Sequence, residues 1–396
     1  MKLAVTTNGR LYKTPEGHYY TQVVYRYDFF LRYLEVFEKV RLIAHCEEIG
    51  VKDVANMVRV DGPNLEIYEV PFPHGKIGYI KKYLAIKSAL CRSLDSCDAA
   101  LLRIPDELAF QLYAEIKKQH LPLAVEVTSD PWMLFKKGNT SDSFFRPFIR
   151  LHWHHMQKKI CREANGTSYV TREYLQHRYP PSVGENFFTT NYTNAEIDET
   201  WLDFCSGNKE NECSRLIHVA TSISGNAKGH RELLSAAGIL LEQGNKVEVA
   251  LVGAGELNSD CKAIVAQYHL EPYLRLLGRL TKEQLKEELS KADIFVFPSY
   301  VEGLPRVVVE AMGMGLPCVA TDLPGIVELL GEEWCVPVQD AMTLASKVKT
   351  LLADSALAKS VGKHNREVAK DFSLPVIKER RNSFYTKLRL LAIKKS

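Results

Sequence analysis

The sequence predicts an α/β protein made of two doubly wound domains, each built on a parallel sheet. Three observations lead to this class. The chain has 396 residues, which is more than one ordinary domain needs. From about residue 215 onward, β-rich runs alternate with helical stretches, as βαβ units on a parallel sheet require. The first half repeats this alternation with more irregular loops, so a second domain of the same kind is expected there.

Composition restricts the class of protein further. Hydrophobic residues make up 46% and charged residues 25%, which excludes disordered, collagen-like and coiled-coil chains. The 9 cysteines form an odd set without a C-x-x-C pair, which favours a reducing, cytoplasmic location over a disulfide or zinc framework. The N-terminus turns polar too early for a signal peptide, and no apolar run is long enough to span a membrane. A net charge of +3 is too small to indicate nucleic acid as a partner.

The first domain is expected over residues 1–192. A linker is expected within residues 186–198, where a short apolar run is followed by turn-forming polar residues. β-rich residues and flanking turn signals predict strands at 2–6, 40–44, 66–70, 99–104, 123–128 and 167–170.

The second domain is expected over residues 193–372. Thr281 and Gln284 form the sequence pattern of a capping box, which predicts the start of a helix that ends before Asp293. The helical stretches separate strands that are predicted at 216–221, 247–253, 274–278, 294–298 and 318–321.

The segment from Pro298 to Thr321 carries the clearest chemical signal. A buried strand ends at Pro298, and Pro305 is expected in the first turn of the helix that follows. Free N–H groups at such a helix start suit a diphosphate, and ligands of doubly wound sheets bind at the carboxyl ends of strands. Glu302 and Glu310 can both face that crevice, where carboxylates suit sugar hydroxyls. Their spacing alone would better fit a helix cap and a solvated helix residue.

The whole string resembles the signature of glycosyltransferase family 4. The resemblance covers residues 215–372 well and is carried by residues 294–299, 302–305, 310–312 and 315–317. It implies the GT-B fold, in which two Rossmann-like domains face each other across a cleft, and sugar transfer from a nucleotide-sugar with retention of anomeric configuration. It also implies that a C-terminal helix, at residues 373–396, returns to the first domain.

The resemblance assigns roles to the donor-binding residues. Glu302 would contact hydroxyls of the donor sugar and Glu310 the ribose, while Gly303 and Leu304 would offer main-chain groups to the phosphates and Pro305 would shape their loop. Lys228 would bind the diphosphate, but the arginine that accompanies it in the family is missing, and Arg231 is a displaced substitute. Three further residues match loops that meet the phosphates or the nucleobase, although simple turns would explain them as well: Gly253, Gly278 and Arg279.

The acceptor side is less well defined. Asn8, Arg10 and Gly17 lie in the loop after the first strand, before an expected long helix, and topology places that loop at the cleft. Asp130 follows the strand at 123–128, where many relatives carry a histidine near the reacting carbon. The predicted catalytic set is therefore Glu302, Lys228 and Asp130, with a turn or N-cap role as the alternative for Asp130.

No metal or other cofactor is expected. The chain contains no Asp-x-Asp, the motif that the other large glycosyltransferase fold uses to hold a metal-bound diphosphate. His152 to His155 include three histidines, but their surroundings predict a basic, aromatic helix rather than a metal site. Aromatic and basic residues also interleave at 72–83, 144–150 and 378–395. These segments predict either peripheral contact with an anionic membrane or packed amphipathic helices with basic outer faces.

The predicted activity is transfer of a sugar from a nucleoside diphosphate sugar, with UDP expected from family frequency, to a hydroxyl of a glycan or polyprenyl-linked acceptor in cell-surface polysaccharide synthesis. In the expected front-face mechanism the leaving diphosphate accepts the acceptor proton. Two alternatives stay open. One is a nucleotide-sugar epimerase of the same fold, and the other is a non-catalytic, nucleotide-sugar-binding partner subunit, which the missing arginine and histidine would fit. The expected location is the cytoplasm, with peripheral attachment to the plasma membrane.

Overall fold

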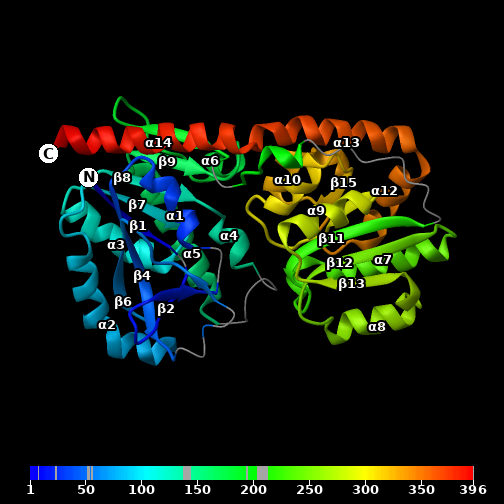
Figure 1. Ribbon diagram of the computed structural model, residues 1–396, viewed down its shortest axis with the longest axis horizontal. Coiled ribbons are helices and arrows are strands. Elements are labelled where there is room, and N and C mark those ends of the chain that lie inside the picture. Colours follow the sequence, from blue (N-terminus) through cyan, green and yellow to red (C-terminus); the bar gives the residue numbers. More distant parts are fainter. Residues whose placement is uncertain are drawn as a thin grey trace.

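A computed structural model describes residues 1–7, 9–22, 25–50, 54, 57–136, 144–192, 195–202 and 213–395. It shows two α/β domains side by side, with two long helices along their upper side (Figure 1). One sheet belongs to each domain, and the predicted fold class is confirmed. Among the helices that these residues form, none is long and apolar enough to cross a membrane.

The first sheet has a parallel centre and a short antiparallel extension at one edge. The strand order is β10-β9-β8-β7-β1-β4-β2-β3-β5, and β6 also pairs with β4. The extension consists of β2 (Leu11–Lys13), β3 (Tyr19–Thr21) and β5 (Val58–Arg59). The parallel strands are β1 (Lys2–Thr6), β4 (Lys39–Glu48), β6 (Leu65–Pro71), β7 (Ala99–Ile104), β8 (Leu123–Val127), β9 (Gly166–Tyr169) and β10 (Phe188–Asn191).

Helices cover both faces of this sheet. On one face α2 (Gly75–Ser93), α3 (Glu107–Lys118) and α5 (Arg146–Glu163) share a core that includes Ile86, Phe110 and Ile160. On the other face α1 (Tyr27–Leu34) and α14 (Leu374–Lys395) share a second core. The Tyr385 hydroxyl of α14 also donates a hydrogen bond of 2.7 Å to Glu126 of β8. The last helix therefore packs on the first domain.

Two expectations for the first half are wrong. The segment expected as a linker contains strand β10, which pairs with β9 and forms an edge of the sheet. The long helix expected after the first loop is also absent from the described residues, because the β2–β3 hairpin comes first and α1 has only 8 residues. The hairpin strands have three residues each and β10 has four of mixed polarity, so no hydrophobic pattern marks them and only their pairing partners reveal them.

The second sheet is entirely parallel, in the order β13-β12-β11-β14-β15-β16. Its strands are β11 (Ser214–Ser222), β12 (Val247–Ala254), β13 (Leu274–Gly278), β14 (Ile294–Phe297), β15 (Cys318–Thr321) and β16 (Cys335–Val336). The helices around it are α7 (His230–Glu242), α8 (Ser259–Gln267), α9 (Lys282–Lys291), α10 (Arg306–Gly313), α11 (Pro324–Leu330), α12 (Ala341–Ala353) and α13 (Ser355–Ala369).

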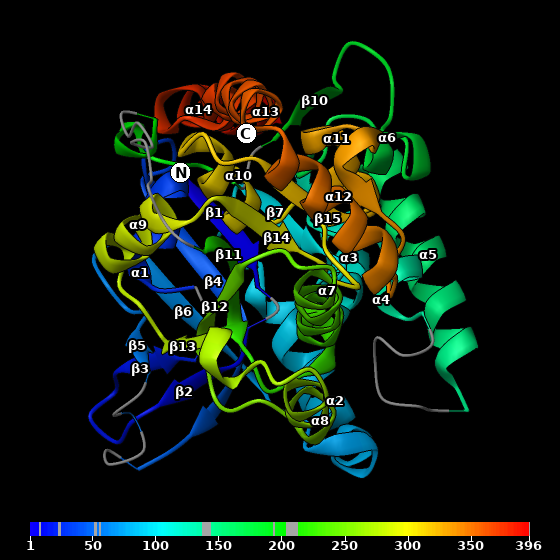
Figure 2. The ribbon, with the colours of Figure 1, turned by 90° about the vertical axis from the view of Figure 1, so that its right-hand side faces the viewer.

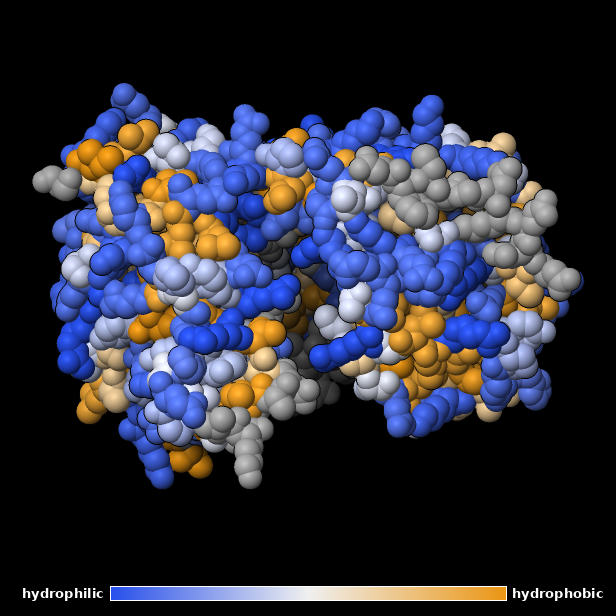
Figure 3. All heavy atoms as spheres, in the orientation of Figure 1, coloured by the Kyte–Doolittle hydropathy of each residue, from blue (hydrophilic) through white to orange (hydrophobic). Residues whose placement is uncertain are grey.

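The order of strands in the second sheet reverses at its centre. From β11 the chain moves outward through β12 to β13, and then returns to place β14 on the other side of β11. Such a reversal leaves a crevice at the carboxyl ends of the two central strands, which is the usual ligand position in open α/β sheets. Figure 3 shows a hollow between the two lobes of the molecule. The crevice of the second sheet is therefore the first candidate for a ligand site.

Candidate active site

Two loops leave the carboxyl ends of β11 and β14 and meet at the crevice. The loop after β11 carries Lys228 and the loop after β14 carries Glu302, and their side chains form an ion pair. The Ser299 hydroxyl donates a hydrogen bond of 2.9 Å to the same Glu302 oxygen, Oε1. The side chains of Lys228 and Glu302 are 32% and 16% exposed to solvent, so a ligand in the crevice can reach both.

Backbone contacts hold these two loops together. The Tyr300 N–H donates to the Ala227 carbonyl oxygen at 2.9 Å, next to Lys228 in the sequence. Gly229 has a φ of +70°, and a Cβ built on it would lie 1.9 Å from the Pro298 carbonyl oxygen. Only glycine fits at this place without a shift of the backbone. The glycine thus allows the Lys228 loop to lie directly on the end of β14.

The Glu302 loop also touches the first domain. A Cβ built on Gly303 would lie 2.4 Å from the carbonyl oxygen of Thr128, which follows the last residue of β8. Leu304 packs against the cores of both domains. The carboxyl ends of β8 and β14 therefore meet, and the crevice of the second sheet opens toward the first domain.

Glu310 lies one turn into α10 and is buried. Its Oε1 atom pairs with Arg306 Nε at 2.9 Å, and only 8% of its side chain is exposed. Burial raises the pKa of the Glu310 carboxyl above its usual value, although the charges of Arg306 and Lys282 oppose that shift. Pro305 is the N-cap residue of α10 rather than a first-turn residue, so the helix begins one position later than predicted.

Asp130 stands on the other side of the domain contact. It is the N-cap of α4 (Pro131–Leu134) and accepts a hydrogen bond of 2.8 Å from the Trp132 N–H. The hydroxyls of Tyr174 and Tyr179 also donate to it, and Arg178 Nε lies 2.8 Å from its Oδ2 atom. A carboxylate has about four acceptor positions, and these three hydrogen bonds occupy most of them while the charge of Arg178 lies beside the carboxylate. The geometry favours the N-cap role for Asp130 over a catalytic one.

The predicted acceptor residues are spread along the edge of the first sheet. Arg10 pairs with Glu47 at 2.9 Å, and its guanidinium lies 3.5 Å from the centre of the Phe72 ring. Gly17 is exposed in the turn of the β2–β3 hairpin, with a φ of +83°. Strands β7, β1 and β4 separate this hairpin from β8, so neither residue is beside the Glu302 loop. Asn8 lies outside the described residues.

The remaining predicted donor residues lie around the crevice of the second sheet. Gly253 has a φ of +156° at the end of β12, and a Cβ built on it would lie 2.8 Å from the Ala220 carbonyl oxygen. Gly278 ends β13 with a φ of +66°, and the exposed Arg279 follows it. Arg231 is exposed in the first turn of α7, where its charge acts on Cys261 and Tyr300. Its substitution for the missing arginine beside Lys228 stays a prediction.

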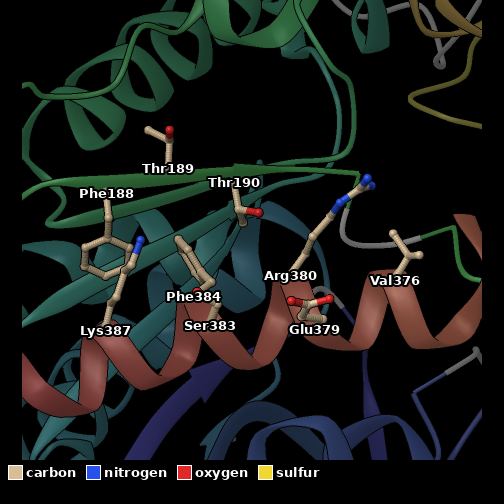
Figure 4. A pocket seen from close by; sticks show the side chains of 9 residues that line it. All are labelled: Phe188, Thr189, Thr190, Val376, Glu379, Arg380, Ser383, Phe384 and Lys387. Atoms are coloured by element: carbon tan, nitrogen blue, oxygen red, sulfur yellow. The ribbon is translucent and has the colours of Figure 1, made fainter. Parts of the chain in front are cut away.

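Two features lie away from this crevice. His154 and His155 are in α5, where their Nδ1 atoms contact the Tyr179 hydroxyl and the Leu151 carbonyl oxygen. A cavity of about 410 Å³ lies between β10 and α14 (Figure 4). Its lining contains none of the predicted donor or acceptor residues: Phe188, Thr189, Thr190, Val376, Glu379, Arg380, Ser383, Phe384 and Lys387.

Comparison with known proteins finds a family match in the second domain. Residues 214–354 match the family described as "Glycosyl transferases group 1". This part of the chain is therefore similar to group 1 glycosyltransferases. It contains both loops of the crevice, with Lys228, Glu302 and Glu310. The matched range runs from β11 to the end of α12, so it contains the whole second sheet.

Relatives extend the similarity over most of the chain. Protein CapJ of Staphylococcus aureus is 25% identical over 347 residues, which cover 87% of this chain and 84% of CapJ. The N,N'-diacetylbacillosaminyl-diphospho-undecaprenol alpha-1,3-N-acetylgalactosaminyltransferase of Campylobacter jejuni is 29% identical over 164 residues, or 41% of this chain and 42% of that enzyme. The solved structure of HepE from Anabaena in complex with UDP matches with a TM-score of 0.64 at 13% identity and covers 100% of both chains. The chain has the GT-B fold.

Sequence reasoning missed two residues that organise the site. Ser299 is fully buried and positions Glu302, but a serine at the end of a strand carries no distinctive pattern. Glu328 of α11 accepts hydrogen bonds from the backbone N–H groups of Arg172, Glu173 and Tyr174, at the start of α6 (Tyr174–Arg178). The second domain thus caps a helix of the first domain. These partners are more than 150 positions apart in the sequence, so no local signal could reveal them.

Proposed function

We propose that this chain is a retaining glycosyltransferase of family 4 that transfers a sugar from a nucleoside diphosphate sugar to a hydroxyl of a glycan or polyprenyl-linked acceptor. The observation that carries the proposal is the Lys228–Glu302 pair at the crevice between β11 and β14. One cation and one carboxylate stand side by side at the usual ligand position of the sheet. A sugar diphosphate needs both: positive charge for its phosphates and an acceptor of hydrogen bonds for its hydroxyls.

The donor occupies the crevice with its diphosphate at Lys228 and at the start of α10. Main-chain N–H groups of Gly303 and Leu304 and the dipole of α10 add positive charge there, so the leaving group needs no metal ion. Glu302 binds the sugar hydroxyls and Glu310 the ribose. UDP is the proposed nucleotide, and the match with UDP-bound HepE supports that choice.

The acceptor approaches from the first domain. The similarity to a Campylobacter jejuni enzyme named for a diphospho-undecaprenol substrate supports a polyprenyl-linked acceptor in cell-surface polysaccharide synthesis. In the reaction the bond between the anomeric carbon and the phosphate oxygen breaks, and the acceptor oxygen bonds to the same face of that carbon. The acceptor proton passes to the leaving phosphate oxygen. No protein base is needed, which agrees with an Asp130 that is buried and hydrogen-bonded to other groups of the protein.

Ligand binding can be tested by thermal shift with UDP, GDP, ADP and their sugars, because a ligand that binds only the folded state raises its melting temperature. UDP and UDP-sugars are expected to give the largest shifts. Glu310→Ala should remove most of the nucleotide shift, and Glu302→Ala mainly the additional shift from the sugar. Equal losses in the two variants would contradict these roles.

Transfer itself requires an acceptor panel, with the anomeric configuration of the product read by NMR. Retained configuration and activity that survives EDTA are expected. A free epimer of the sugar, formed without acceptor, would instead identify an epimerase. Nucleotide binding without hydrolysis or transfer on any acceptor would identify a non-catalytic partner subunit.

A further inference from the structure

Apolar side chains stand in solvent along the first half of α2. Ile77, Ile80 and Leu84 are 71%, 76% and 78% exposed, and Tyr83 is 47% exposed. The second half of the helix behaves differently, because Ile86 and Leu90 are buried in the core. Large apolar residues left in water over several consecutive turns cost free energy unless another surface covers them.

A second group of the same kind lies at the start of α5. Phe144, Phe145 and Phe148 are 86%, 53% and 65% exposed, and Leu151 is 49% exposed. Elsewhere in the described part of the chain, exposed large apolar residues do not form groups of four within one helix and its flanking residues.

The two groups lie on the same side of the first domain. Helices α2 and α5 belong to one layer, since both contribute to the core on one face of the first sheet. Helix α2 follows β6, and α5 follows β8 through α4, so both helices start near the carboxyl edge of that sheet. Figure 2 shows both helices starting low in the molecule, on the side away from α13 and α14. We call the eight exposed residues and the basic residues of these helices the α2–α5 surface.

Charge is strongly segregated toward this surface. Helix α2 contains five basic residues and no acidic one. Residues 144–162 contain another five basic residues and again no acidic one. The whole chain has 51 basic and 48 acidic residues, so the remainder of the chain is acidic on balance. Exposed aliphatic and aromatic groups set among basic side chains are what an anionic lipid surface attracts.

The C-terminal helix shows a similar sequence pattern, but three of its basic residues form ion pairs with carboxylates of the protein. Lys378 pairs with Glu35 at 2.9 Å, Arg381 with Glu196 at 2.6 Å and Arg389 with Glu38 at 2.6 Å. Its basic residues hold the helix on the first domain. The three segments share the sequence pattern, but α2 and the start of α5 each expose four large apolar residues. Helix α14 exposes three, none of them by more than 52%.

We propose that the α2–α5 surface binds a bilayer that contains anionic phospholipids, with the apolar side chains in the interface and the lysines and arginines at the headgroups. This contact holds the carboxyl edge of the first sheet at the membrane, where a polyprenyl-linked acceptor resides. The statement about the acceptor rests on the proposed function, whereas the binding to lipid does not.

The test is sedimentation of the full-length chain with vesicles of phosphatidylcholine alone or with about 30% phosphatidylglycerol. Binding to the anionic vesicles is expected to be at least ~10-fold stronger and to weaken with salt. Ile80→Gln/Leu84→Gln should lower the partition coefficient by about 10-fold or more, and Lys81→Glu/Lys87→Glu by a similar factor. The control for the apolar variant is Met342→Gln, which alters an apolar residue of α12 that is 65% exposed. The control for the charge variant is Lys359→Glu/Lys363→Glu on α13. Both control variants should bind the vesicles as the unmodified chain does.

Three outcomes would overturn the proposal. The first is equal binding to neutral and anionic vesicles, and the second is unchanged binding of both α2 variants at unchanged melting temperatures. The third is loss of a chain dimer in the α2 variants without any lipid binding. The last would identify the surface as a contact between copies. With a water-soluble acceptor the α2 variants should retain full transfer activity, while transfer to an acceptor embedded in vesicles should fall. If no acceptor of either kind reacts but lipid binding follows the expected pattern, the proposed function fails and the membrane surface stands.

Discussion

Glu302 and Asp130 lie on opposite sides of the contact between the two domains, near the carboxyl ends of β14 and β8. Their surroundings differ. Glu302 has one lysine and one serine as partners and keeps 16% of its side-chain exposure. The side chain of Asp130 is only 3% exposed. It is surrounded by the first N–H group of α4, two tyrosine hydroxyls and an arginine. The more exposed carboxylate, Glu302, can bind a ligand in the crevice. The buried carboxylate of Asp130 holds α4 and α6 together.

The difference also shows how the two domains divide the work. The second domain offers polar groups to the crevice on loops that are fixed by backbone contacts, as with Tyr300 and Ala227. The first domain contributes a rigid wall there, in which Asp130 ties α4 to α6, and Glu328 of the second domain caps α6 in turn. Four predictions test this division, beginning with the largest expected effect.

Glu302→Gln should reduce the rate of sugar transfer by about 10²- to 10³-fold, the range seen when one group that stabilises a transition state is removed. Glutamine keeps the shape of the side chain but loses the charge that pairs with Lys228. The melting temperature should change little. Glu256→Gln, which alters a carboxylate 86% exposed, is the matched control and should leave the rate unchanged. A rate within threefold of the unmodified chain would exclude Glu302 from the site.

Asp130→Ala should act on stability instead. It removes the N-cap of α4 and leaves Arg178 and two tyrosine hydroxyls without their shared partner, which costs roughly 3 kcal/mol in the free energy of unfolding. Denaturant titration measures this loss, and Tyr174→Phe should cost about 1 kcal/mol because it deletes one hydrogen bond. If Asp130→Ala were as stable as the unmodified chain yet inactive, the catalytic role would be correct after all.

Glu310→Gln should change how stability depends on pH. Burial raises the pKa of this carboxyl in the folded chain above its unfolded value of 4.5. The protonated carboxyl contributes fully to the free energy of unfolding below pH 4.5. This contribution is lost as the pH rises through the pKa of the folded chain. Glutamine cannot ionise, so the variant does not lose this stability as the pH rises. Its free energy of unfolding should therefore rise relative to that of the unmodified chain, by about 1.4 kcal/mol for each unit between the folded and unfolded pKa values. Unfolding curves between pH 4 and 8 measure the slope, and parallel curves would contradict the assignment.

Glu328→Ala should have the smallest effect. The carboxylate caps α6 from the other domain, and loss of a cap costs about 1 kcal/mol. Glu328→Gln should cost less, since its amide oxygen still accepts hydrogen bonds. Hydrogen exchange should locate the loss at the amides of Arg172, Glu173 and Tyr174, while exchange elsewhere in the first domain should stay unchanged. Uniform exchange changes would show that Glu328 acts on the whole interface rather than on α6.

The strands and the donor loops were accessible to sequence reasoning because their signals are local. Strands β11 to β15 fall within two residues of the predicted ranges, and the capping box at Thr281 forms as expected. Strand β10 was missed because four residues of mixed polarity resemble a linker until β9 lies beside them. The roles proposed for Glu302, Glu310 and Lys228 remain predictions, although the structure brings Lys228 and Glu302 into contact.

The sequence by itself determined the α/β class, the strand-loop-helix segment around Glu302 and the match of the second half to group 1 glycosyltransferases. These features depend on residues that are close together along the chain. Only the tertiary structure decided that Asp130 is buried among its partners, that Glu328 caps a helix of the other domain and that α2 exposes its large apolar side chains more than α14 does. Each of these depends on which distant segment packs nearby, because burial and pairing are set by neighbours in space.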